Sequence, residues 1–245
     1  MNLDRVTITG ADDSIPPEAL LKLSIRYPFV EWGILLSKAQ EGGPRYPSLK
    51  WMEALGEIAR KSRFMKLSGH LCGRWVRELV LEANYSFLTD RPSIGLIFNR
   101  IQLNFHAYSH RPAHQAFFSR IGVEPRQYIF QQDGVNDNLF RDAWTAWPKI
   151  DAVPLYDISG GRGILPERWP PAYEGVYNGY AGGLGPDNLK EEIEKIGKTA
   201  GKERFWVDME SKIRTANDLL FDLDKVIRCL DIAAPFVEKG EKSGT

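Results

Sequence analysis

Short apolar runs recur along the chain, and each is followed by a stretch in which apolar residues have helical spacing. The ends of successive runs lie about 28 residues apart, and a unit of one strand and one helix needs roughly 30 residues. Because the runs are mostly apolar rather than alternating, they predict strands that are covered on both faces, as in a parallel sheet. The eight runs are 6–9, 29–36, 64–68, 101–104, 127–131, 152–157, 175–180 and 204–208.

The clearest helical stretches are 48–58, 186–196 and 219–237, where apolar residues recur every three or four positions. Eight strand–helix units predict an α/β fold, a closed (β/α)8 TIM barrel. An open, doubly wound sheet is the alternative. No Pro- or Ser-rich linker divides the chain, so we expect one barrel domain over residues 1–237 and a polar C-terminal tail over 238–245.

Composition and charge narrow the class of protein. Of the 245 residues, 43% are hydrophobic and 26% are charged, which is typical of soluble globular proteins. The 32 basic residues balance 32 acidic ones, so no overall positive field favours nucleic acid or an anionic membrane as a partner. Two cysteines exclude a disulfide scaffold, and no apolar run has the length of a signal peptide or a membrane span. We therefore expect a cytoplasmic monomer or homodimer without nucleic-acid or membrane partners.

A glycine-rich segment follows the start of the seventh predicted strand. Residues 179–185 read Gly-Tyr-Ala-Gly-Gly-Leu-Gly, and Pro186 then begins a helix. Glycines let backbone N–H groups approach an anion closely, and the positive end of the helix dipole faces the same point. Residues 207–211, at the end of the eighth strand, can supply further donors. The pattern predicts a phosphate site at the barrel mouth, and a glycine-rich turn that only ends the strand is the alternative.

A carboxylate ends the sixth predicted strand. Asp157 comes directly after the apolar run, and glycines follow it at 160, 161 and 163. In α/β barrels the chemistry takes place at the carboxyl ends of the strands. Asp157 is therefore a candidate general acid or base, and a helix or turn cap is the alternative.

Four stretches together resemble one known family, phosphoribosylanthranilate isomerase, the (β/α)8 enzyme of tryptophan biosynthesis. Residues 43–48 (Gly-Pro-Arg-Tyr-Pro-Ser) resemble its S-x-R-Y-V-S segment, and 181–188 (Ala-Gly-Gly-Leu-Gly-Pro-Asp-Asn) resemble its A-G-G-L-x-P-x-N loop. Asp157 and the glycines after it are similar to its L-L-D…G-G-T-G segment, and 207–211 (Val-Asp-Met-Glu-Ser) to its V-D-V-S-S strand end. The resemblance is strong in the C-terminal third and weak over residues 64–148.

The resemblance implies an Amadori rearrangement, in which a general acid protonates a furanose ring oxygen and a base removes a proton from C2. Asp157 matches the acid. Arg45 matches the arginine that binds the substrate carboxylate, and a guanidinium suits such bidentate pairing. No cofactor is implied, and the expected partner is a small phosphorylated substrate. The positions that match phosphate-binding elements are Gly161, Gly182, Gly183, Met209, Glu210 and Ser211.

The catalytic base does not carry over, because Thr9 stands where the family has a cysteine. A threonine hydroxyl is far less acidic than a thiol and is no substitute unaided. Asp12 in the same loop is the tentative base. Asp13 beside it is an alternative, and His70 and Cys72 are weaker ones.

Two further departures fall at the predicted site. Glu210 replaces a serine, and a carboxylate there repels phosphate unless it is paired; residues 102–105 (Gln-Leu-Asn-Phe) replace Q-L-H-G. The sequence therefore predicts an isomerase-like enzyme that acts on a small phosphosugar-type substrate by acid–base chemistry. A non-catalytic binding protein for a phosphorylated or carboxylated metabolite, on the same barrel, is the alternative.

Three histidines, His106, His110 and His114, are spaced four apart, and three histidines suit zinc. Pro112 lies among them and disrupts an internal helical turn. The spacing therefore favours a polar helix start, and we expect no metal site.

Overall fold

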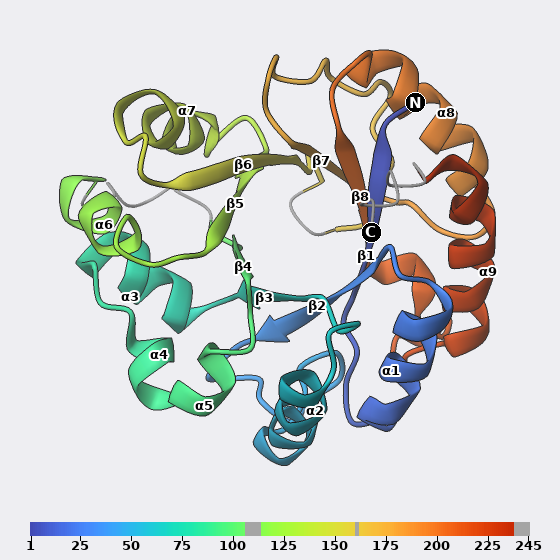
Figure 1. Ribbon diagram of the computed structural model, residues 1–245, viewed down its shortest axis with the longest axis horizontal. Coiled ribbons are helices and arrows are strands. Elements are labelled where there is room, and N and C mark those ends of the chain that lie inside the picture. The colour runs from blue at the N-terminus through green and yellow to red at the C-terminus, as the bar shows by residue number, and fades with distance from the viewer. Residues whose placement is uncertain (106–113, 160–161, 238–245) are drawn as a thin grey trace, which may run out of the picture.

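Eight parallel strands form a closed barrel (Figure 1). The computed structural model describes residues 1–105, 114–159 and 162–237. Strand β1 pairs with β2 on one side and with β8 on the other, which closes the ring. The predicted (β/α)8 barrel is thus confirmed. The strands are β1 (Leu3–Thr9), β2 (Val30–Leu36), β3 (Leu67–Leu71), β4 (Arg100–Leu103), β5 (Gln127–Gln132), β6 (Asp151–Tyr156), β7 (Asn178–Ala181) and β8 (Phe205–Met209).

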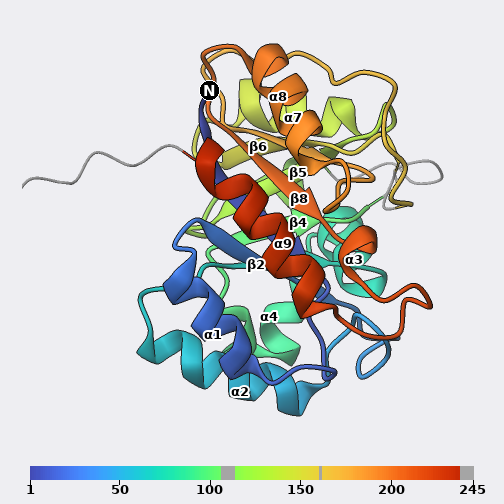
Figure 2. The same cartoon turned by 90° about the vertical axis from the view of Figure 1, so that its right-hand side faces the viewer.

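Helices surround the barrel and cover its outer face, as Figures 1 and 2 show. Their inward faces pack on the outward apolar residues of the strands in one continuous core. The α-helices are α1 (Pro17–Arg26), α2 (Leu49–Lys61), α3 (Arg74–Glu82), α4 (Ser86–Asp90), α5 (Pro92–Gly95), α6 (His114–Ile121), α7 (Asp137–Ala146), α8 (Leu189–Ala200) and α9 (Leu223–Ala233), and the 3-10 turns are η2 (Ser211–Ile213) and η3 (Ala234–Phe236).

The connection from β6 to β7 contains no helix in its described part, residues 157–159 and 162–177. Prolines at 166, 170 and 171 remove backbone donors that a helix needs. Other contacts hold the segment instead: the hydroxyls of Tyr156 and Tyr180 donate to the carbonyls of Pro171 and Pro170. Residues 162–177 therefore form a strap without a helix, held against β6 and β7 by these hydrogen bonds.

The inside of the barrel is divided into a polar and an apolar half. Within β1 to β4, the buried Glu31 carboxylate accepts hydrogen bonds from the Thr7 hydroxyl (3.0 Å) and from Arg100 Nη1 (2.6 Å). Since β2 and β4 are not neighbours, the Glu31–Arg100 bond crosses the interior. Four inner side chains of β5, β6 and β8 form a separate buried apolar cluster of Ile129, Val153, Leu155 and Trp206, and Asp208 of β8 lies beyond them at the mouth.

Strand β3 begins three residues later than the predicted run 64–68. Phe64, the first residue of that run, is 38% exposed. The strand instead alternates, with polar Ser68 and His70 lying between apolar Leu67 and Leu71. Among the described helices, none has both the length and the apolar character that a bilayer span requires.

Candidate active site

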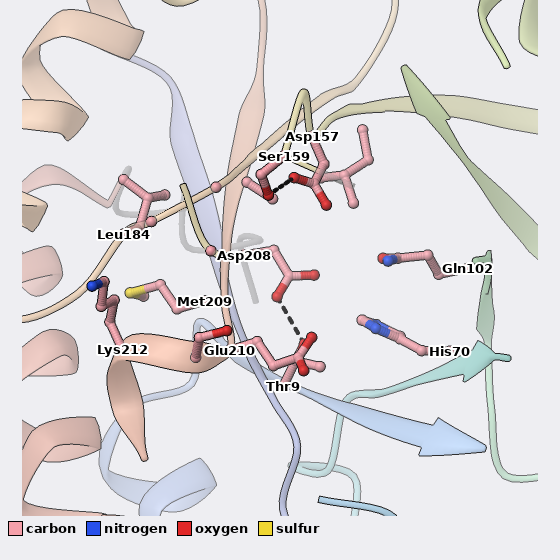
Figure 3. Close-up of a pocket in the computed structure, with 16 residues that line it drawn as sticks. Thr9, His70, Gln102, Asp157, Ser159, Leu184, Asp208, Met209, Glu210 and Lys212 are labelled. Atoms are coloured by element: carbon pink, nitrogen blue, oxygen red, sulfur yellow. Dashed lines mark hydrogen bonds between the residues drawn. The ribbon is translucent and has the colours of Figure 1, made fainter. Parts of the chain in front are cut away.

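A cavity of about 40 Å³ opens at the carboxyl ends of the strands (Figure 3). Five carboxyl-terminal strand or loop segments, those of β1, β3, β4, β6 and β8, place polar side chains around it. The lining side chains that carry chemistry are Thr9, His70, Gln102, Asp157, Ser159, Asp208, Glu210, Ser211 and Lys212.

Asp208, on β8, is the central carboxyl group of this cavity. Thr9 donates a hydrogen bond from its hydroxyl to Asp208 Oδ1 (2.7 Å). Burial raises the pKa of Asp208 to about 8, against the opposing effect of the Thr9 hydrogen bond. The charges of Glu210, Glu31 and Asp157 raise it further. Asp208 is therefore mostly protonated at pH 7 and can give up its proton near physiological pH.

Asp157 follows β6 and supplies the second carboxyl group of the cavity. It is 6% exposed. Ser159 donates a hydrogen bond from its hydroxyl to Asp157 Oδ1 (2.7 Å), and Gln131 donates from Nε2 to Oδ2 (3.4 Å). The side chain thus points into the mouth, as predicted from its place at the strand end. Its catalytic role stays a prediction.

His70 and Gln102 form the opposite wall, and Figure 3 shows both side chains pointing toward Asp208. They are neighbours in the β3–β4 register. Burial lowers the pKa of His70 to about 3, so the imidazole is neutral at pH 7. Within the described part of the chain, His70 Nε2 and Gln102 Oε1 are buried and lack a hydrogen-bond partner. These two atoms leave hydrogen-bonding capacity beside the central carboxyl group.

Gly33 makes room for this arrangement. A Cβ atom at Gly33 would lie 2.2 Å from Thr9 Oγ and 2.8 Å from His70 Cε1. Both approaches are shorter than any normal contact. The absence of a side chain at Gly33 therefore lets the side chains of Thr9 and His70 approach each other over β2.

The loops after β6, β7 and β8 meet at a glycine corner, defined as Gly163, Gly182, Gly183, Ser211 and Lys212, and all five line the cavity. Gly182 and Gly183 have φ of 119° and 65°, which favour glycine. The backbone of the β6 loop packs directly against them. A Cβ atom on Gly183 would lie only 2.5 Å from the backbone nitrogen of Leu165 in that loop.

Three other predicted phosphate-binding positions are placed differently. Gly161 lies outside the described residues. Met209 lines the cavity but has only 1% of its surface exposed. Glu210 lines the cavity, and its carboxylate pairs with Arg45. Burial raises the pKa of Glu210, while Arg45 acts in the opposite direction. Binding of phosphate by any of these positions stays a prediction.

Arg45 holds two protein carboxylates. Its guanidinium hydrogen-bonds Glu210 through Nη1 and Asp218 through Nη2. The residue itself adopts a left-handed backbone, with φ of 64°. The predicted role, binding a substrate carboxylate, would require a ligand to replace one of these internal partners.

Asp12, the tentative base, is engaged away from the cavity and does not line it. Its carboxylate accepts from the Ser14 hydroxyl (2.5 Å), the Arg45 backbone N–H (2.6 Å) and Arg214 Nη2 (2.8 Å). Burial alone would raise the pKa of Asp12, but hydrogen bonds from Ser14 and Arg45 give a net lowering. These contacts favour a role in ordering the β1 loop, and its role as base stays a prediction.

The other candidates for the catalytic base, Asp13, His70 and Cys72, lie in different positions relative to the cavity. Asp13 binds Ser48, the residue that caps the amino end of α2. The Cys72 sulfur accepts a hydrogen bond from Asn104 Nδ2 (3.2 Å), and burial raises the pKa of Cys72 to about 11. His70 alone among these three lines the cavity.

Sequence reasoning missed Asp208 as an acid–base candidate. The strand-end motif directed attention to backbone donors at 207–211, although Asp208 is two residues from the inward-facing Trp206 and so shares its face. Of the three histidines weighed as zinc ligands and not favoured as such, His106 and His110 lie outside the described residues, as does the side chain of His114. In the portion that is described, no group of three metal-ligating side chains is found.

Comparisons with known proteins support the fold. No protein-family model matches the chain, and no curated protein matches it. N-(5′-phosphoribosyl)anthranilate isomerase from Pyrococcus furiosus is a structural neighbour with a TM-score of 0.53 and 14% identity, over 95% of this chain and 99% of that one. A putative spore coat polysaccharide biosynthesis protein E from Chromobacterium violaceum has a TM-score of 0.52 and 12% identity, over 100% of this chain and 78% of that one. At such identities the likeness concerns the fold alone.

Proposed function

We propose that this protein is an isomerase-like enzyme that transfers protons on a small phosphorylated substrate, with Asp208 and Asp157 as its acid–base pair. The observation that carries the proposal is the buried Asp208 carboxyl, with a pKa of about 8, in the same cavity as Asp157. Two carboxyl groups in unlike environments are a common arrangement for separate acid and base roles. The likeness in fold to phosphoribosylanthranilate isomerase agrees with this chemistry.

The proposed step moves one proton onto the substrate and one proton off it. Asp208 enters the step protonated and delivers its proton to the substrate oxygen that gains negative charge. Asp157 takes a proton from the adjacent substrate carbon. The substrate keeps its number of protons, and proton exchange with water restores both side chains. This assigns the acid role to Asp208 in place of Asp157, and it needs no contribution from Asp12.

The remaining polar groups have binding roles in this proposal. The glycine corner, with the Lys212 ammonium, would hold the phosphate group at a helical turn, η2. His70 Nε2 and Gln102 Oε1, both without a partner among the described residues, would bind substrate hydroxyl groups. Neutral His70 adds hydrogen bonding without adding charge.

A second candidate is a binding protein without turnover. The position of Asp12 favours it, because this tentative base does not line the cavity and its carboxylate is held by Ser14 and Arg214. The cavity volume of about 40 Å³ does not separate the two candidates, since both have to accommodate the same class of ligand.

Solvent deuterium exchange separates the two candidates. The protein is incubated in D2O with phosphorylated sugars, including phosphoribosylanthranilate, and deuterium at the substrate carbon is followed by NMR. We expect exchange with the wild type and a loss of about 10²-fold or more in Asp208→Asn and Asp157→Asn. Glu53→Gln, on the exposed face of α2, is the control. Binding of a phosphorylated sugar without any exchange in the wild type would overturn the enzyme and support the binding protein.

A further inference from the structure

The opposite end of the barrel, at the amino ends of the strands, has a second and larger cavity. Its volume is about 640 Å³. Ionised side chains from six different strands or the loops that precede them converge on it. They are the basic Arg5, Lys66, Arg100, Arg126 and Lys149 and the acidic Glu31, Glu124 and Asp151. Five positive groups against three negative ones leave this end with an excess of two positive charges.

Part of the excess positive charge comes from a buried triad of Arg5, Glu31 and Arg100. Glu31 Oε2 accepts from Arg5 Nη1 (2.7 Å), and Glu31 Oε1 accepts from Arg100 Nη1 (2.6 Å). One carboxylate thus serves two guanidinium groups. Glu31 and Arg100 have only 2% and 4% of their side chains exposed, whereas Arg5 is 22% exposed and reaches the cavity.

The triad leaves guanidinium nitrogens without acceptors. Arg100 donates from Nε to Gln127 Oε1 (2.8 Å) and lies over the Trp206 ring at 4.2 Å. These contacts fix the plane of the guanidinium. Even so, Arg100 Nη2 and Arg5 Nε are buried and have no partner among the described residues. A buried positive charge without full compensation is costly, and a bound anion relieves that cost.

The rim of the cavity adds positive charge near Arg5. Lys66 donates to the carbonyl of Pro28 (2.6 Å), and it forms no ion pair with a carboxylate among the described residues. Burial lowers the pKa of Lys66, and the positive charge of Arg5 lowers it further. Arg126, in contrast, is paired with Glu124. A bound anion would therefore be stabilised most by the charges of Arg5 and Lys66.

We propose that the amino end of the barrel is a binding site for a phosphate-class dianion, centred on Arg5 and Lys66 above the Glu31–Arg100 pair. A charge of minus two matches the excess of the lining. Guanidinium and ammonium groups are the usual partners of phosphate oxygens in proteins. The volume admits free phosphate or a phosphate ester of a small metabolite. The site lies at the opposite end of the barrel from the proposed active site, and it shares no lining residue with the cavity there.

Isothermal titration calorimetry at constant ionic strength tests the proposal with inorganic phosphate and with ribose 5-phosphate. Lys66→Met should weaken binding at this end by about tenfold, the loss of one charge-assisted hydrogen bond. Lys22→Met, on the exposed face of α1, should change nothing. All measurements are repeated in a Lys212→Met background, which removes the ammonium group at the mouth.

The outcomes distinguish the two ends of the barrel. Binding that survives Lys212→Met and is weakened by Lys66→Met supports the amino-end site. Tighter binding of ribose 5-phosphate than of phosphate identifies the ligand as an ester, and equal or weaker binding identifies free phosphate. Binding that Lys66→Met leaves unchanged, or the absence of any phosphate binding in the Lys212→Met protein, overturns the site and leaves the function proposed for the mouth intact.

Discussion

Replacing Asp208 by asparagine should remove a pH-dependent cost from the folded protein. In the fold the carboxyl pKa is raised from 3.8 to about 8, chiefly by burial. The folded state therefore favours the protonated form, and the stabilising contribution of that proton is complete below the unfolded-state pKa. It is lost progressively as the pH rises through the folded-state pKa. Asparagine keeps the size and the acceptor for Thr9 and never ionises.

The size of this change in stability follows from the interval between the unfolded-state and folded-state pKa values of Asp208. Between the two pKa values the folding free energy changes by about 1.4 kcal/mol per pH unit. From pH 5 to pH 7.5, Asp208 should therefore cost the wild type about 3 kcal/mol of stability. Asp208→Asn should show none of this loss. The difference in unfolding free energy between the wild type and the variant should therefore change by about 3 kcal/mol from pH 5 to pH 7.5.

Urea unfolding followed by far-UV circular dichroism at pH 5, 6 and 7.5 measures this difference. Other titrating groups are common to both proteins and cancel in the comparison. Glu53→Gln, an exposed change on α2, controls for the loss of one carboxylate. Parallel stability–pH profiles for the wild type and Asp208→Asn would refute the raised pKa, and with it the reason for giving Asp208 the acid role.

Two further changes test how the mouth is held together. Gly183→Ala should destabilise the fold by about 2–4 kcal/mol, because the left-handed φ of 65° and a Cβ 2.5 Å from a backbone nitrogen both disfavour alanine there. Gly134→Ala is the control: its φ is 84° but its surroundings are open, so the substitution should cost only about 1–2 kcal/mol. Equal losses in urea unfolding would contradict the close packing. Arg214→Met should cost about 3–5 kcal/mol by leaving the Asp12 carboxylate unpaired. Adding Asp12→Asn should recover part of that loss, and a purely additive double variant would count against the ion pair.

The fold could be read from the sequence because strand and helix periodicity is local. Eight apolar runs at regular spacing gave the number of strands and the closure. The β3 boundary was misplaced for an equally local reason: the barrel interior on that side is polar, so the strand containing Ser68 and His70 alternates, and the apolar run at Phe64 lies outside it. The strap from β6 to β7 was missed although its prolines were a visible signal.

The side-chain partners of the site could not be read in the same way. Arg45 pairs with Glu210 across 165 positions, and Asp12 pairs with Arg214 across 202. Both pairs exist because β1 pairs with β2 on one side and with β8 on the other, which brings the loops after β1 and β2 close to the loop after β8. A motif assigns residue types to a loop, but it does not show which carboxylate a guanidinium will take.

The polar half of the interior connects the two ends of the barrel electrostatically. Strands β1 to β4 carry Thr9, His70 and Gln102 at the mouth and Arg5, Glu31 and Arg100 at the amino end. The charge of Glu31 contributes to the raised pKa of Asp208, and the charges of Glu31 and Arg100 act on His70 in opposite directions. An anion bound beside Arg5 adds negative charge on the same side, and so it favours the protonated form of Asp208 still more. Occupancy of the amino end would thus move the pH at which Asp208 gives up its proton toward higher values, without any change of shape in the barrel between them.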